Sequence, residues 1–191
     1  MLQEFAEQVE RVARSVMEEM HTSIPGKIVM FDVDKGMATV KPYGTYKTEA
    51  GKMFKYPLIT GVPVIIPQCQ SASICIAFPI QSGDECLIII SEQELDEWLS
   101  NASSENDMRF DLTNAIAIPG LSKLVLPALK EACTNQKIII ANENTKLAVS
   151  KDEIEMIGNV KIKGKLLLND LNINEHTHIS SEVGFDTGKP H

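Results

Sequence analysis

The feature that most limits how this chain can fold is a run of very short β-prone segments within residues 136–175. The segments, each bounded by turn residues, are 137–141, 146–150, 154–157, 160–163, 166–168 and 171–173. Strands this short cannot bury an apolar face within one chain. The repeats therefore predict that identical copies intertwine, as a homotrimeric β-prism or triple-stranded β-helix. A single-chain β-helix is the rival, but this stretch would give it only about two coils.

A His-x-His motif, His176-Thr177-His178, follows the last of these segments. In an extended strand residues i and i+2 point to the same side, so both imidazoles face one way. One such pair is a poor metal site, because only two ligands converge. Three pairs around a threefold axis supply six nitrogens in an octahedral arrangement, which suits Fe(II) or another divalent first-row ion. We therefore predict a metal apex over residues 176–191, with one divalent first-row ion, iron or another, held by His176 and His178 of three chains.

The two histidines allow two other interpretations. They could be an accidental pair on a loop. Alternatively, with Glu182 they match the first half of the cupin metal motif, which would make the chain a metalloenzyme. A cupin needs a second histidine segment and further strands, whereas the sequence given continues only to His191. We therefore favour the structural metal site.

An amphipathic helix is predicted at the start of the chain, within residues 1–22. Its apolar residues recur at spacings of three and four, opposite Glu, Gln and Arg: Leu2, Phe5, Val9, Val12, Val16 and Met20. Two interpretations remain equal. The helix either lies on its own domain or docks against a partner or sister chain.

Residues 23–110 are predicted to form a small barrel of the OB type. Segments 27–33 and 37–41 flank the turn sequence Asp34-Lys35-Gly36 and indicate a hairpin. Further strands are expected at residues 58–66, 74–78 and 86–90, and residues 42–57 indicate an excursion between strands.

Two shorter features lie beyond the last of these strands. Residues 91–94, Ser-Glu-Gln-Glu, have the form of a capping box and predict a short helix that carries Leu95, Trp98 and Leu99 on one face. Residues 111–135 mix prolines with apolar segments and are expected to be a connector to the trimeric β-helix of residues 136–175. The predicted fold class is therefore mainly β, with a helix, a barrel and an intertwined spike in that order.

Charge and motif content limit the possible functions. The formal net charge of −8 disfavours nucleic acid and anionic membranes as partners. No secretory signal and no apolar run long enough to span a bilayer is evident. Catalytic motifs such as G-x-S-x-G, a Walker loop and H-E-x-x-H are absent, so we expect neither enzymatic activity nor a small-molecule substrate. The four cysteines (Cys69, Cys75, Cys86 and Cys133) lack C-x-x-C spacing and are expected to be buried free thiols.

Several stretches resemble the Gp138-type baseplate spike proteins of phages. Residues 78–84 (FPIQSGD) with 95–98 (LDEW) resemble the central barrel of that family, and 109–121 (RFDLTNAIAIPGL) resembles the segment that follows it. The motif His176-Thr177-His178, with Gly184, Thr187, Gly188 and Pro190, resembles the tip of contractile-tail spikes.

The resemblance implies a homotrimeric central spike with an iron ion at its apex, to which His176 and His178 carry over as ligands. Such a spike belongs at the baseplate tip of a virion or tailocin particle assembled in the host cytoplasm, where it contacts the tail hub or tube and pierces the target cell envelope on sheath contraction. An OB-fold baseplate adaptor remains the alternative. Attachment of the N-terminal helix to the hub or tube is a further hypothesis.

Overall fold

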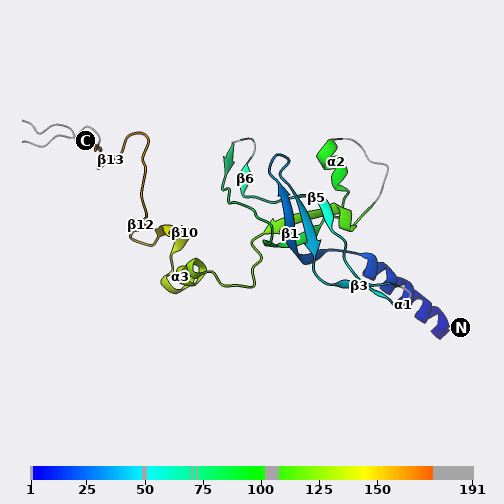
Figure 1. The fold of residues 1–191 in the computed structure, drawn as a ribbon. Helices are drawn as coiled ribbons and strands as arrows, with labels where there is room; N and C mark the ends of the chain where they lie inside the picture. Colours follow the sequence, from blue (N-terminus) through cyan, green and yellow to red (C-terminus); the bar gives the residue numbers. More distant parts are fainter. Residues whose placement is uncertain (1, 49–50, 70, 72, 102–107, 174–191) are drawn as a thin grey trace, which may run out of the picture. The chain divides into compact units, whose positions relative to one another are not determined.

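The computed structural model describes residues 2–48, 51–69, 71, 73–101 and 108–173 (Figure 1). By its internal contacts the chain divides into two compact units, Met1–Lys123 and Leu124–His191. The first unit is a curled β-sheet with an N-terminal helix, and the second is a helix followed by short strands. Each unit is described by itself below.

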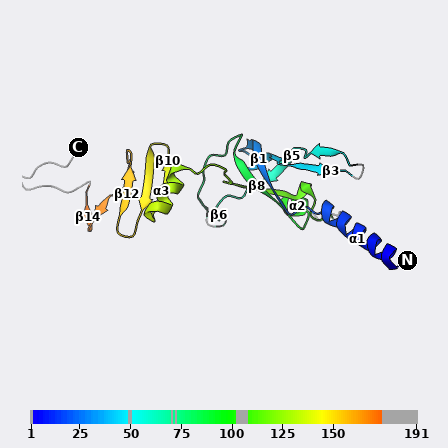
Figure 2. The ribbon, with the colours of Figure 1, turned by 90° about the horizontal axis from the view of Figure 1, so that it is seen from below.

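A five-stranded antiparallel sheet forms the centre of the first unit. Its strands, in spatial order, are β5 (Ile59–Pro63), β2 (Met37–Pro42), β1 (Ser23–Asp32), β8 (Glu85–Ile90) and β9 (Ala115–Pro119). The two outermost strands approach each other, because Val64, just after β5, forms a parallel bridge with Ala117 of β9. The sheet therefore curls into an OB-like half barrel, visible in Figures 1 and 2.

Local sequence explains the hairpin that starts this sheet. The Asp32 Oδ1 atom accepts hydrogen bonds from the backbone N–H groups of Asp34 and Lys35, both at 3.1 Å. Gly36 follows with a φ of +67°, which glycine adopts without strain. Strands β1 and β2 then pair antiparallel, as the turn sequence predicted.

Curvature comes from irregular pairing and from one close approach. Register shifts interrupt the β1–β2 pairing between Ile28 and Met30 and the β2–β5 pairing between Ala38 and Val40. Such bulges increase the local twist. Gly26 pairs with both β2 and β8, and a Cβ atom there would collide with the Ile88 side chain and lie 3.1 Å from the Lys41 carbonyl oxygen. The sheet can therefore curl tightly at Gly26 because no side chain intervenes.

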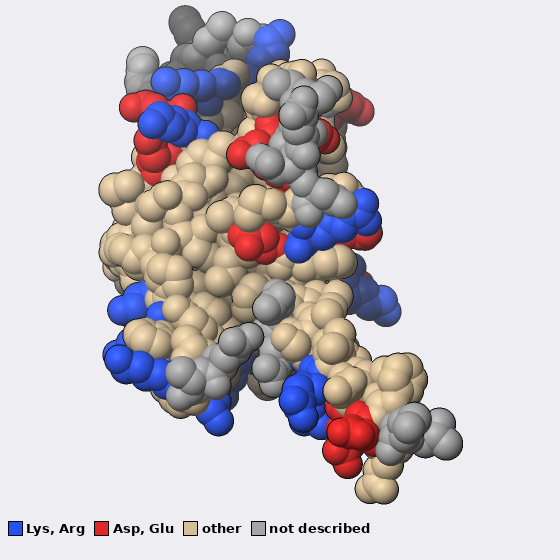
Figure 3. All heavy atoms as spheres, turned by 90° about the vertical axis from the view of Figure 1, so that its right-hand side faces the viewer, with Lys and Arg blue, Asp and Glu red and all other residues tan. Residues whose placement is uncertain are grey.

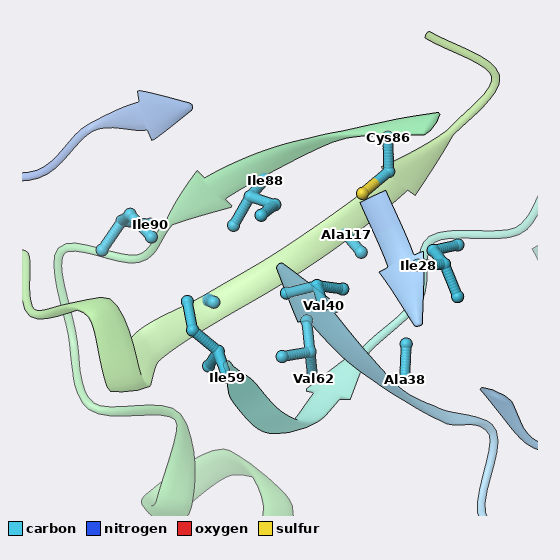
Figure 4. Packing of buried hydrophobic residues seen from close by; sticks show 10 residues of the cluster. Ile28, Ala38, Val40, Ile59, Val62, Cys86, Ile88, Ile90 and Ala117 are labelled. Atoms are coloured by element: carbon cyan, nitrogen blue, oxygen red, sulfur yellow. The ribbon is translucent and has the colours of Figure 1, made fainter. Parts of the chain in front are cut away.

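Ten buried residues from all five strands fill the concave side of the half barrel (Figure 4). They are Ile28, Ala38, Val40, Ile59, Val62, Cys86, Ile88, Ile90, Ala115 and Ala117. Strand β8 shows the period of two clearly, because its residues 86, 88 and 90 are buried and those between them are half-buried. The first unit therefore has a private hydrophobic core.

The cysteines were predicted to be buried, and the structure corrects this for three of them. All four are free thiols, but only Cys86 is buried, whereas Cys69, Cys75 and Cys133 are exposed. Desolvation, with a smaller contribution from the charge of Glu85, raises the pKa of the Cys86 thiol to about 11. The error arose because apolar neighbours in the sequence indicate a strand but do not show which way a side chain points.

The fifth strand of the barrel is not the one that the sequence predicted. Residues 74–78 were expected there, but β7 (Ile74–Cys75) pairs only with β6 (Gln68–Cys69) in a separate exposed ribbon. The fifth strand is β9, which lies within the expected connector 111–135. Its sequence Ala-Ile-Ala-Ile alternates small and large side chains, and it pairs with β8 from Cys86 to Ile90. The connector hypothesis is therefore wrong for β9.

Helix α2 (Leu95–Ser100) forms where it was predicted, but the capping box does not. Glu94 is the N-cap residue and makes no side-chain capping hydrogen bond. Instead, the Leu95 N–H donates to the Oδ1 atom of Asn114, at 3.3 Å. Asn114 belongs to the short 3-10 helix η2 (Leu112–Asn114). A backbone N–H group at the start of α2 therefore finds its hydrogen-bond acceptor in a residue that is distant in sequence.

Two elements extend from the sheet of the first unit. Helix α1 (Leu2–Glu19) confirms the predicted N-terminal helix. The ribbon of β3 (Thr45–Lys47) and β4 (Met53–Lys55) occupies the expected excursion 42–57. Figure 3 shows one face of the molecule, on which acidic and basic side chains surround a broad uncharged area.

The described part of the second unit, residues 124–173, contains one helix and five short strands. Helix α3 (Pro127–Asn135) has proline at its start and Gln136, in the left-handed conformation, at its end. The sequence did not predict it, because Pro119 and Pro127 indicate a connector. Strands β10 (Ile138–Asn142), β11 (Thr145–Val149) and β12 (Ile154–Ile157) form an antiparallel meander, and β13 (Leu167–Leu168) pairs with β14 (Leu171–Asn172). The predicted strand at 160–163 is irregular backbone.

Candidate self-association surface and metal motif

Strand register assigns every residue of the β10–β11–β12 sheet to one of two faces. Residues directly opposite each other across an antiparallel pair lie on the same face. Ile138, Val149 and Ile154 form one row across the three strands, and Ile140, Leu147 and Met156 form the next row on the same side. We call this surface of six residues the open face. The other side carries Ile139, Ala148 and Glu155, then Ala141, Lys146 and Ile157.

Helix α3 covers the side opposite the open face. The Lys146 ammonium donates to Glu131 Oε1 of α3 at 2.7 Å, and both side chains are largely sheltered from solvent. Ala148, next to Lys146 on this side, is 1 % exposed. The hydrogen bond to Glu131, and then the charges of Glu131 and Glu155, raise the pKa of Lys146 above its ordinary value. This side of the sheet is therefore covered within one chain at β10 and β11, while Ile157 of β12 is 44 % exposed.

The open face consists entirely of large apolar side chains and is largely uncovered within the described residues. Ile138 is 70 % exposed and Ile154 is 65 % exposed, and the central Val149 and Leu147 are half-buried. A sheet that meets water on one side normally carries polar residues there, whereas strands buried on both sides are apolar throughout. The sequence Ile138-Ile139-Ile140 follows the second pattern. Each aliphatic side chain would gain about 1.5–3 kcal/mol from complete burial.

Apolar exposure continues beyond the open face. An open hollow of about 360 Å³ is lined by residues that include Ile140, Leu147, Met156 and Val160. Further exposed apolar residues before and after the sheet are Leu124, Val125, Leu126, Leu129, Ile162, Leu166, Leu167, Leu168 and Leu171. Exposed apolar groups in this number are typical of a surface that associates with another molecule. The apolar surface of the second unit is therefore a candidate for contact with another chain.

The predicted metal ligands His176 and His178 lie outside the described residues, as does Glu182 of the cupin alternative. Within the described part of the chain, His, Cys, Asp and Glu residues form no group of three or more that could hold a metal ion. The last described strand, β14, ends at Asn172, four residues before His176. The donor chemistry of a neutral imidazole pair fits a divalent first-row ion when several pairs converge, so the iron site remains a prediction.

Sequence reasoning identified the region of the open face but missed the residues that define it. The run of short apolar segments was the correct signal. The missing part was α3, because a covered side and an uncovered side can be told apart only when the helix that covers one of them is known. Pro127 at the first turn, with Leu129 and Ala132 following, was the signal for that helix.

A comparison with protein-family models matches residues 24–120 to the N-terminal domain of phage protein Gp138. The match spans 97 of the 191 residues (24 through 120), just over half of the chain. It begins in β1 and ends directly after β9, so it includes the whole half barrel.

The chain belongs to the Gp138 family of phage proteins. This confirms the family that the sequence resembled. Membership indicates a structural component of a phage particle, associated with other virion proteins, rather than an enzyme. No curated protein matches the chain. Among the described residues of this Gp138 family member, no helix is long and apolar enough to cross a membrane.

Proposed function

We propose that this Gp138 family protein is the central spike at the baseplate tip of a contractile phage tail or phage-tail-like bacteriocin. Three copies associate through the open face and the apolar residues around it, with an intertwined β-helix over 136–175. The spike is carried on the tail hub or tube and pierces the target cell envelope when the sheath contracts. The observation that carries the proposal is the open face, an apolar surface on a phage structural protein with no cover from its own chain within the described residues.

Rigidity is the property that a piercing element requires. The β-segments of the second unit are too short to be rigid alone, and chain termini fray unless they are held. Intertwining would bury the open face of each copy and add hydrogen bonds at the edge strands β10 and β12.

His176 and His178 of the three copies would hold one iron ion, which would join the three chain ends on their common axis. Imidazole must be neutral to bind a metal, so acid should release the ion below about pH 6, given an ordinary histidine pKa near 6.5.

The test combines native mass measurement with metal analysis of the full chain. We expect a trimer that contains one iron ion. His176→Ala or His178→Ala should remove the iron, while Thr177→Ala, the matched control between them, should retain it. A monomer without metal would contradict the spike and favour the adaptor, and one metal ion per monomer would favour a cupin-like enzyme.

The adaptor function has one observation in its favour, the aromatic ribbon β3–β4. Tyr46 stacks on Phe54 with ring centroids 5.9 Å apart, and Tyr56 lies 5.4 Å from Tyr46. The Lys52 ammonium lies 5.5 Å from the centre of the Phe54 ring. Exposed aromatic groups beside a cation are typical of binding surfaces. This surface is compatible with the spike, which must also contact its baseplate.

A further inference from the structure

Helix α1 presents a second apolar surface, at the other end of the chain from the open face. Every described side chain from residue 3 to residue 17 is exposed. Val9 is 52 % exposed and Val12 is 64 % exposed, and Phe5 and Val16 are similarly uncovered. An isolated helix of this length is marginal in water, and valine is a weak helix former. A helix with this composition therefore needs a partner to stay folded.

The spacing of the apolar residues follows a heptad. Phe5, Val9, Val12 and Val16 are separated by four, three and four residues, as the d and a positions of a coiled coil are. Assigning them as d, a, d and a places Ala6 and Ala13 at e, with Gln8 and Ser15 at g. None of these flanking residues is charged.

From residue 2 to residue 18 the charges of the helix lie away from this seam, and Glu19, the last residue of the helix, falls at the next d position. Glu4, Glu7, Glu10, Arg11 and Arg14 occupy the b, c and f positions, and Arg14 pairs with Glu10 at 2.8 Å along the outer surface. Flanking charges at e and g usually select an oppositely charged partner and repel an identical copy. Their absence removes repulsion between parallel copies. An anionic membrane is an unsuitable partner, because interfacial helices carry lysine and arginine on the polar side.

We propose that α1 forms a parallel three-helix coiled coil with α1 of two further copies of this chain. The β-branched valines decide the number of strands, since β-branched residues at both a and d favour three or more helices over two. Only residues 20–22 separate α1 from β1, so the coiled coil would hold three half barrels together at their N-terminal ends. The inference depends on residues of α1 and not on the open face, although a trimer formed through that face would raise the local concentration of the helices.

The test must separate the two association surfaces. Ile140→Asp with Leu147→Asp places charges on the open face of the full chain and serves as the background. Sedimentation equilibrium of this background should still show a concentration-dependent monomer–trimer equilibrium. Adding Val9→Asp and Val12→Asp should shift that equilibrium to more than about 100-fold higher concentration, because buried charges oppose assembly, and should lower the helical circular dichroism signal.

Gln3→Asp with Met17→Asp is the matched control, since it adds the same charge at two exposed b positions and should leave the equilibrium unchanged. A background chain that is monomeric or dimeric at all concentrations would overturn the coiled coil. Failure of the spike proposal is distinguishable, because in that case the open-face substitutions would leave the concentration at which the otherwise unchanged trimer dissociates unaltered, whereas a true open-face interface would raise it.

Disulfide cross-linking tests whether the α1 helices run parallel. In a chain with Cys69, Cys75 and Cys133 replaced by serine, Val12→Cys places thiols at one level of the seam, where copper-catalysed air oxidation should join two chains by a disulfide. Met17→Cys, on the outer surface, should give no such product. Equal cross-linking at both positions, or at neither, would contradict the parallel arrangement.

Discussion

The two units of this protein use apolar residues in opposite ways. In the half barrel, ten residues from five strands turn toward one another and become buried within a single chain. In the second unit, Ala148 is the one buried apolar residue among those described, while isoleucines and leucines lie exposed on the open face and around it. The difference is one of strand number and closure, since five strands that curl can enclose a core, whereas a three-stranded sheet that does not close cannot. A similar content of apolar residues therefore produces a self-sufficient core in one unit and an exposed apolar face in the other.

The largest difference between the two units is expected when each is produced without the other. Residues 20–123 alone should unfold cooperatively as a monomer, with a midpoint independent of protein concentration, because their core is internal. Residues 124–191 alone should be either assembled or unfolded, because a folded monomer would leave the open face in water. Thermal denaturation with light scattering at several concentrations measures both. A stable, folded monomer of residues 124–191 would contradict the claim that only the first unit folds without a partner.

One substitution in each unit should show the same difference within the full chain. Ile88→Ala removes a side chain that is fully buried in the half barrel and should lower its free energy of unfolding by about 2–5 kcal/mol. Ile140→Ala should leave that unfolding transition unchanged and instead raise the concentration at which the trimer dissociates by at least about tenfold.

Chemical denaturation and sedimentation measure these two effects. Val33→Ala, at a residue 81 % exposed, and Lys151→Ala, at an exposed turn, are the respective controls. If Ile140→Ala leaves the concentration at which the trimer dissociates unchanged, the open face is not an interface.

The smallest expected effect concerns the side of the sheet that α3 covers. Glu131 raises the pKa of Lys146, so the pair stabilises the folded unit fully below the ordinary lysine pKa of about 10.4. That stabilisation is lost as pH rises through the higher pKa of the folded state. The unfolding midpoint of the second unit should therefore fall above about pH 10, and Lys146→Met should remove this part of the fall. Lys151→Met, at a lysine in an exposed turn, should leave the pH profile unchanged.

Much of the fold could be predicted because it depends on local sequence. The hairpin around Asp34-Lys35-Gly36, helix α1 and strand β8 follow from turn chemistry and from the period of the apolar residues. The fifth barrel strand could not be predicted in this way. Segments 74–78 and 115–119 are both β-prone, and the choice between them depends on which one pairs with β8 and bridges back to Val64.

Capping of α2 shows the same limit at the scale of one hydrogen bond. Ser91 and Glu94 have the spacing of a capping box, yet Asn114 accepts the hydrogen bond at the start of this helix. Nineteen residues separate Leu95 from Asn114, and only the folded chain brings them together. The metal motif lies outside the described residues, so its prediction still depends on sequence and on the proposed threefold arrangement.

By itself the sequence determined the family, the early elements of the barrel and the region of short apolar strands. Those properties are local, because turn residues, apolar period and segment length act within a few positions of one another. The tertiary structure decided which strand completes the half barrel and which side of the C-terminal sheet is left open. Both depend on contacts between residues far apart in the chain, namely β9 with β8 and α3 with β10, and no local pattern specifies such pairings.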